Sequence, residues 1–89
     1  MDWQDEYSDD LTKILQKLKK KDPVQYIVVR KKMTEILKNP LHYKNLRYDV
    51  SDRRRVHVNS SFVLVYSIDI HKNLIRFLNY DHHDVIYNR

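Results

Sequence analysis

The spacing of apolar residues changes once along this chain of 89 residues, at Asn39 and Pro40. Before that point apolar residues recur every three or four positions, as on one side of an amphipathic helix. After it, two-residue alternation and short apolar runs between turn residues predict strands. One change of period in so short a chain predicts a single α+β domain over residues 1–89, with helices first and a sheet second.

Two helices are predicted in the first half of the chain. Ser8 is a candidate N-cap for the first helix, and Asp22 followed by Pro23 is typical of the start of the second. The second helix should end at Asn39 and Pro40, which gives an antiparallel helical hairpin. The predicted core stripes are Leu11, Ile14, Leu15 and Leu18 in the first helix, and Tyr26, Val29, Met33, Ile36 and Leu37 in the second.

Three strands are predicted in the second half, over residues 53–58, 62–69 and 73–80. Their short connections favour an antiparallel meander, with the helical hairpin packed on one face of this small sheet. The central strand is apolar on both faces. The acidity of residues 1–8 weakens the alternative of an additional strand there.

The absence of glycine and cysteine excludes several functional classes. Without glycine there is no phosphate-binding P-loop, dinucleotide fingerprint or nucleophile elbow. Without cysteine there is no disulfide, zinc finger or catalytic thiol. Left-handed backbone positions should then fall largely to asparagine. The asparagines near predicted element ends are Asn39, Asn45, Asn59, Asn73 and Asn79.

The net charge of +5 is unevenly distributed. Residues 1–10 hold five acids and no base, so the other 79 residues carry 17 Lys and Arg against 7 acids, a net of +10. Such a body favours a polyanionic partner, either nucleic acid or an acidic protein segment, although a soluble domain with solvated lysines is equally compatible. The acidic N-terminus predicts no signal peptide, and no run approaches the roughly 20 apolar residues of a membrane span.

Successive side chains of the predicted strand over residues 53–58 point to alternate faces of the sheet. If Val56 and Val58 face the helices, Arg53, Arg55 and His57 point to the open face of the sheet. Two arginines and a histidine in file suit phosphate recognition. The alternative is an edge strand protected by charge against aggregation.

The segment YDHHDVIY, residues 80–87, has two adjacent histidines and three interpretations. A metal site is disfavoured, because His82 and His83 on an extended chain point to opposite sides and the spacing lacks HxH or HxxxH. The imidazoles can instead cap a turn. They can also exchange protons near neutral pH, which beside a basic strand suggests phosphodiester cleavage.

Residues 7–87 together resemble the RelE/ParE superfamily of toxins from toxin–antitoxin pairs. YSDDLTKILQKLKKKDP resembles the family's aromatic–serine opening and lysine-rich first helix, and IVVRKKMTEILKNPLHYKNLR its second helix, NP break and basic lead into the sheet. RRVHV, FVLVYSID and LIRFLNYDHHDVIY resemble its last three strands and terminal tyrosine motif.

The resemblance implies a RelE-like fold and a cytoplasmic ribonuclease that cuts mRNA on the ribosome without metal or other cofactor. A RelB-like antitoxin would silence it by lying over Arg55 or blocking His83. His83 and Tyr87 match the family's spacing of a terminal His and an aromatic residue, so the resemblance implies His83 as acid or base, with Tyr87 positioning the base or phosphate. Arg55 and His57 would supply phosphate contacts. The implied RNA-binding residues are Lys44, Arg47, Arg53, Arg54 and Arg76.

Two departures from the family keep other functions open. Phe62 and Val63 stand where many relatives have an arginine, and NSS replaces the usual Gly-Asp turn. A ParE-like inhibitor of DNA gyrase and a basic RNA-binding module without catalysis are the alternatives. The histidine pair argues against the gyrase inhibitor, because ParE-like chains tend to lack acid–base residues.

Overall fold

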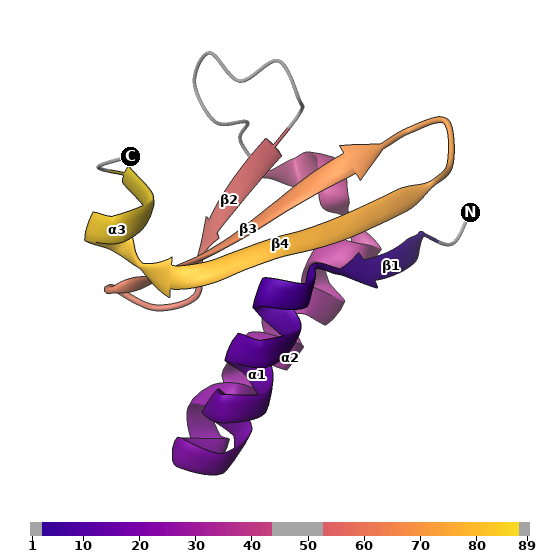
Figure 1. Ribbon diagram of the computed structural model, residues 1–89. Helices are drawn as coiled ribbons and strands as arrows, with labels where there is room; N and C mark the ends of the chain where they lie inside the picture. Colours follow the sequence, from indigo (N-terminus) through magenta and orange to yellow (C-terminus); the bar gives the residue numbers. More distant parts are fainter. Residues whose placement is uncertain (1–2, 44–52, 88–89) are drawn as a thin grey trace.

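The computed structural model describes residues 3–43 and 53–87, and it consists of a helical hairpin on one face of a four-stranded sheet (Figure 1). The helices are followed by the three predicted strands, so the predicted α+β class is confirmed. The elements are β1 Gln4–Tyr7, α1 Asp9–Lys21, α2 Pro23–Lys38, η1 Pro40–His42, β2 Arg53–His57, β3 Phe62–Asp69, β4 Leu74–His82 and α3 His83–Tyr87.

The helix starts follow the predicted capping chemistry. The Ser8 hydroxyl accepts a hydrogen bond from the Leu11 N–H and donates to the Leu78 carbonyl, so one side chain caps α1 and ties it to β4. The Asp22 carboxylate accepts from the Gln25 N–H, with Pro23 in the first turn of α2. Both predicted N-caps are therefore confirmed.

The sheet has the strand order β1-β4-β3-β2 and is mixed rather than purely antiparallel. Strands β2, β3 and β4 form the predicted meander, but β1 pairs in parallel with β4. A strand does form within residues 1–8, contrary to the expectation from their acidity, because β1 is an edge strand whose acids stay in solvent. Its inward anchor is Tyr7, whose ring packs 5.5 Å from that of Phe77.

The core lies between the helical hairpin and one face of the sheet. Tyr66, fully buried on β3, donates its hydroxyl to the Pro40 carbonyl at 2.6 Å and so fixes η1 against the sheet. The buried core cluster consists of Leu11, Leu15, Val29, Met33, Ile36, Val56, Leu64, Tyr66, Ile68, Ile75, Phe77 and Tyr80.

The turns use asparagine in two ways. Asn73 has the positive φ of 50° that was expected, and it is alone in this among the described non-glycine residues. Asn39 and Asn79 were predicted to share it and do not. Asn59 instead accepts hydrogen bonds from the Ser61 and Phe62 N–H groups through its side chain, because an Asx turn satisfies the backbone without a left-handed residue. Asn45 lies outside the described residues.

The end of the chain departs from the predicted strand over residues 73–80. β4 continues to His82, and a short helix, α3, follows where no helix was expected. The His83 N–H donates to the Ser61 carbonyl at 2.7 Å, which fixes the start of α3 beside the β2–β3 turn. None of the helices in the described segments is long and apolar enough to span a bilayer.

Replacing Tyr66 with phenylalanine tests the link between η1 and the sheet. Tyr66→Phe should lower the free energy of unfolding by about 1–2 kcal/mol, because the buried Pro40 carbonyl loses its donor. Urea unfolding with an unchanged m value would measure this. Tyr7→Phe is the control, since that hydroxyl bonds Asp5 and Arg30 at the surface, and it should cost less. Equal stability of Tyr66→Phe and wild type would contradict the role given to this hydroxyl.

Tyr80 predicts a dependence of stability on alkaline pH. Burial raises the pKa of its phenol, although the hydrogen bond from Gln25 opposes this. A raised pKa means that the folded chain keeps a proton that the unfolded chain loses near pH 10, so stability falls as pH rises through the folded pKa. Urea unfolding between pH 9 and 11 should show a shallower fall for Tyr80→Phe than for wild type, and parallel curves would contradict this.

Candidate functional site on the open face of the sheet

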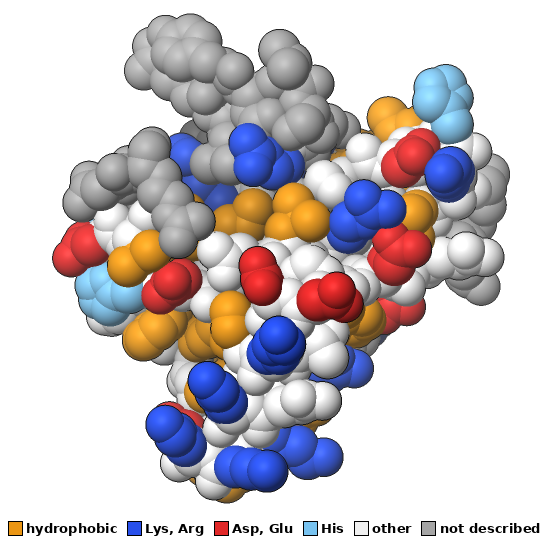
Figure 2. All heavy atoms as spheres, viewed as in Figure 1, with side chains coloured by type: hydrophobic (Ala, Val, Ile, Leu, Met, Phe, Trp, Pro, Cys, Tyr) orange, Lys and Arg blue, Asp and Glu red, His pale blue; other side chains and the backbone are white. Residues whose placement is uncertain are grey.

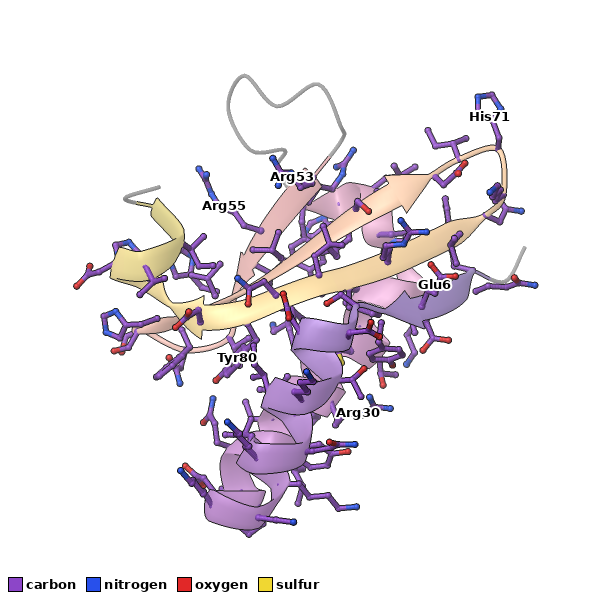
Figure 3. The ribbon with its side chains drawn as sticks, in the orientation of Figure 1. Glu6, Arg30, Arg53, Arg55, His71 and Tyr80 are labelled. Atoms are coloured by element: carbon purple, nitrogen blue, oxygen red, sulfur yellow. The ribbon has the colours of Figure 1, made fainter. Side chains whose placement is uncertain are left out.

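Strand β2 divides its side chains between the two faces of the sheet as predicted. Val56 is buried against the helical hairpin. Arg53 and Arg55 point away from the hairpin, whereas Tyr80 points toward it (Figure 3). His57, two residues after Arg55 on an extended strand, lies on the same open face.

The strand register places the open-face residues in cross-strand rows. His57, Val63 and Asp81 form one row, Arg55, Val65 and Asn79 the next, and Arg53, Ser67 and Arg76 lie further along. Val63 and Val65 are buried although they lie outside the cluster against the helices. They give the face an apolar floor, and charges beside low-dielectric material interact more strongly than charges in open water.

The structure brings together two histidines that are 26 positions apart in the sequence. The imidazoles of His57 and His83 lie with ring centroids 5.7 Å apart and planes tilted by 35°. His57 ends β2, and the Ser61 carbonyl holds the backbone of His83. The His83 Nδ1 also lies 3.2 Å from an oxygen of Asp84. Two imidazoles this close can act on one ligand, one accepting a proton and the other donating it.

His82 has a different environment from its neighbour. Its ring packs edge-on against Phe62 at 5.5 Å, on the helix side of the sheet. Its Nδ1 accepts a hydrogen bond from the Asp84 N–H at 3.1 Å, which caps the first turn of α3. His82 thus follows the interpretation in which an imidazole caps a turn, and the two histidines do point to opposite sides.

The guanidinium groups of Arg54 and Arg76 form hydrogen bonds with other parts of the chain. Arg54 lies on the helix side, and its guanidinium donates to the carbonyls of Leu41 and Tyr43. Arg76, on the open face, bonds the Glu6 carboxylate at 2.7 Å. The role of Glu6 was not predicted from the sequence, because its contact with Arg76 depends on the parallel pairing of β1 with β4. The sequence showed only an acidic residue in a segment that was judged too acidic to form a strand.

The structure describes little of the remaining predicted site residues. Lys44 and Arg47 lie outside the described residues. Tyr87 is the last residue of α3, and the placement of its side chain is also outside what is described. Within residues 3–43 and 53–87, no three His, Asp or Glu side chains gather as a metal site requires.

Known proteins resemble this chain in sequence. No protein-family profile matches it. A Methanocaldococcus jannaschii protein with the name "Putative toxin RelE4" is 49% identical over 79 residues, which cover 89% of this chain and 84% of that protein. An uncharacterized protein of Methanosarcina mazei is 42% identical over 78 residues, or 88% of this chain and 91% of that protein.

Solved structures resemble it in fold. The matching chain of the toxin–antitoxin complex RelBE2 from Mycobacterium tuberculosis superposes with a TM-score of 0.76 at 20% identity. The match covers 93% of this chain and all of that one. At this identity the likeness shows the shared architecture of hairpin and sheet.

Adjacent arginines on β2 allow a matched test of the two faces. Arg54→Gln should lower the free energy of unfolding by about 1–3 kcal/mol, because two carbonyls lose a charged donor. Arg55→Gln should destabilise the chain less and should elute earlier from a heparin column, because it removes a cation from the open face. Urea unfolding and the eluting salt concentration measure the two effects. Reversed effects would contradict the assignment of faces.

Proposed function

The chain belongs to the RelE-like toxins of toxin–antitoxin systems, and from this premise we propose that it is an endoribonuclease that cleaves mRNA on the ribosome. The single observation that carries the proposal is the pair of imidazoles, His57 and His83, on a face lined by arginines. The proposed place of action is the cytoplasm, where translating ribosomes present mRNA.

The proposed reaction is attack of a ribose 2′-OH on the adjacent phosphate. A neutral imidazole removes the proton of the 2′-OH as the bond from O2′ to phosphorus forms. The protonated imidazole donates its proton to the leaving 5′-oxygen as the bond from phosphorus to O5′ breaks. The products are a 2′,3′-cyclic phosphate and a 5′-OH. Imidazole is the side chain that most readily exchanges protons near neutral pH, so a pair of them suits this division into base and acid.

The arginines of β2 supply the second requirement, which is stabilisation of negative charge. Negative charge builds on the non-bridging phosphate oxygens in the transition state. Arg55 lies one strand repeat from His57 on the same face, and Arg53 one repeat further. We assign Arg55 to the scissile phosphate and Arg53 to the neighbouring RNA backbone. Lys44, Arg47, Arg54 and Arg76 remain candidates for backbone contacts, and Tyr87 for positioning the base or phosphate.

The toxin assignment also implies a partner protein. The M. tuberculosis structure with this fold is a toxin–antitoxin complex. We infer that a cognate antitoxin binds this chain and silences it, as its family membership leads one to expect.

Alanine substitutions of single histidines test the proposed chemistry. His57→Ala and His83→Ala should each slow cleavage of mRNA on programmed ribosomes by about 10²–10⁴-fold, because each removes a proton-transfer group. Single-turnover cleavage of a labelled mRNA measures the rate. His71→Ala is the matched control, because this exposed histidine lies in the β3–β4 turn at the far end of the sheet (Figure 3) and should keep the wild-type rate.

Two results would overturn the assignment. Wild-type rates in both His57→Ala and His83→Ala would remove these residues from the chemistry. Absence of cleavage by the wild type, together with loss of DNA supercoiling by gyrase in its presence, would move the chain to the ParE-like class of gyrase inhibitors.

A further inference from the structure

Helix α2 has an apolar stripe on its outer side that is exposed and lies outside the core cluster. The stripe consists of Val24, Ile27 and Val28, which are 73%, 64% and 39% exposed. Their spacing places them on one side of the helix, across from the buried Val29 and Met33. Exposed apolar side chains that cluster on one helix face are a feature of binding surfaces.

The stripe borders an open hollow of about 450 Å³ between β1, α1 and α2. Ile27 precedes Arg30, a lining residue of the hollow, by three positions and so lies next to it on the helix surface. Two aromatic rings with cations over them form part of the wall: Arg30 over Tyr7 at 5.4 Å and Lys19 over Tyr26 at 5.7 Å. The hollow can therefore receive an apolar or acidic side chain from a partner that binds along the stripe.

The net charge of the helical hairpin indicates which kind of partner can bind along the stripe. Residues 9–38 carry nine Lys and Arg against four Asp and Glu, a net of +5. Basic side chains gather on the part of the hairpin that projects from the sheet (Figure 2). Beside the stripe itself, Lys31 follows Ile27 by one helical turn. A second copy of this chain would bring +5 against +5, whereas an acidic helix would find complementary charge.

We propose that the α2 stripe and the adjoining hollow form the docking surface for an acidic amphipathic helix of the antitoxin. The inference rests on the antitoxin partner proposed above and adds where that partner binds. The apolar side of the incoming helix lies along Val24, Ile27 and Val28, and its acids face Arg30 and Lys31. This surface is on the hairpin side of the sheet, away from His57 and His83.

The docking surface can be tested by measuring affinity for the antitoxin. The protein used as the antitoxin is the product of the open reading frame adjacent to the one that encodes this chain. Ile27→Asp should raise the dissociation constant of the purified pair by about 10–100-fold, because it removes an apolar contact and opposes the incoming acids. Ile27→Lys should weaken binding less than Ile27→Asp. The matched control is Ile70→Asp, since Ile70 is 60% exposed in the β3–β4 turn and should leave the affinity unchanged. Biolayer interferometry measures all four chains.

Other outcomes would overturn the inference in distinguishable ways. A complex with wild-type affinity in Ile27→Asp would remove the surface while leaving the antitoxin partner intact. Failure of the wild-type chain to bind that product would remove both. A wild-type dimer in sedimentation that Ile27→Asp converts to a monomer would show that a second copy, rather than an acidic helix, occupies the stripe.

Discussion

The antiparallel pairing of β3 with β4 is the contact on which the other features depend. One side of the pair, through Tyr66 and Phe77, receives the helical hairpin. The other side carries the buried valines Val63 and Val65, which lie beneath the arginines of the open face. Where the pair ends, Phe62 lies opposite His82, so the next residue of the chain, His83, meets the β2–β3 turn. A shift of one residue in this register would exchange the two faces and move His83 away from His57.

The division between faces also decides which cations can meet a phosphate. Arg54 and Arg55 are chemically identical neighbours, yet one guanidinium holds backbone carbonyls of the helix side and the other lies on the open face. Arg76 is on the open face but already bonds Glu6. RNA binding through Arg76 therefore competes with a charged partner within the chain.

Local features of the chain could be predicted from the sequence, and contacts between distant segments could not. Alternation was enough to place Arg55 and His57 on one face, because side chains on a strand alternate by geometry. The approach of His57 to His83 depends on the β3–β4 register and on the turn into α3. The parallel pairing of β1 is likewise long-range, and the edge position that tolerates its acids is visible only once the sheet order is known.

The two proposed surfaces lie on opposite sides of the sheet, and this constrains how a partner can silence the chain. The rings of His57 and His83 lie together on the open face of the sheet, whereas Ile27 lies on the hairpin. A helix docked on α2 alone leaves the histidines accessible to a short RNA. Silencing then requires either a second segment that passes around the sheet edge or exclusion of the hairpin from the ribosome. In the second case the bound partner would block cleavage of ribosomal mRNA but leave the chemistry of the histidine pair intact.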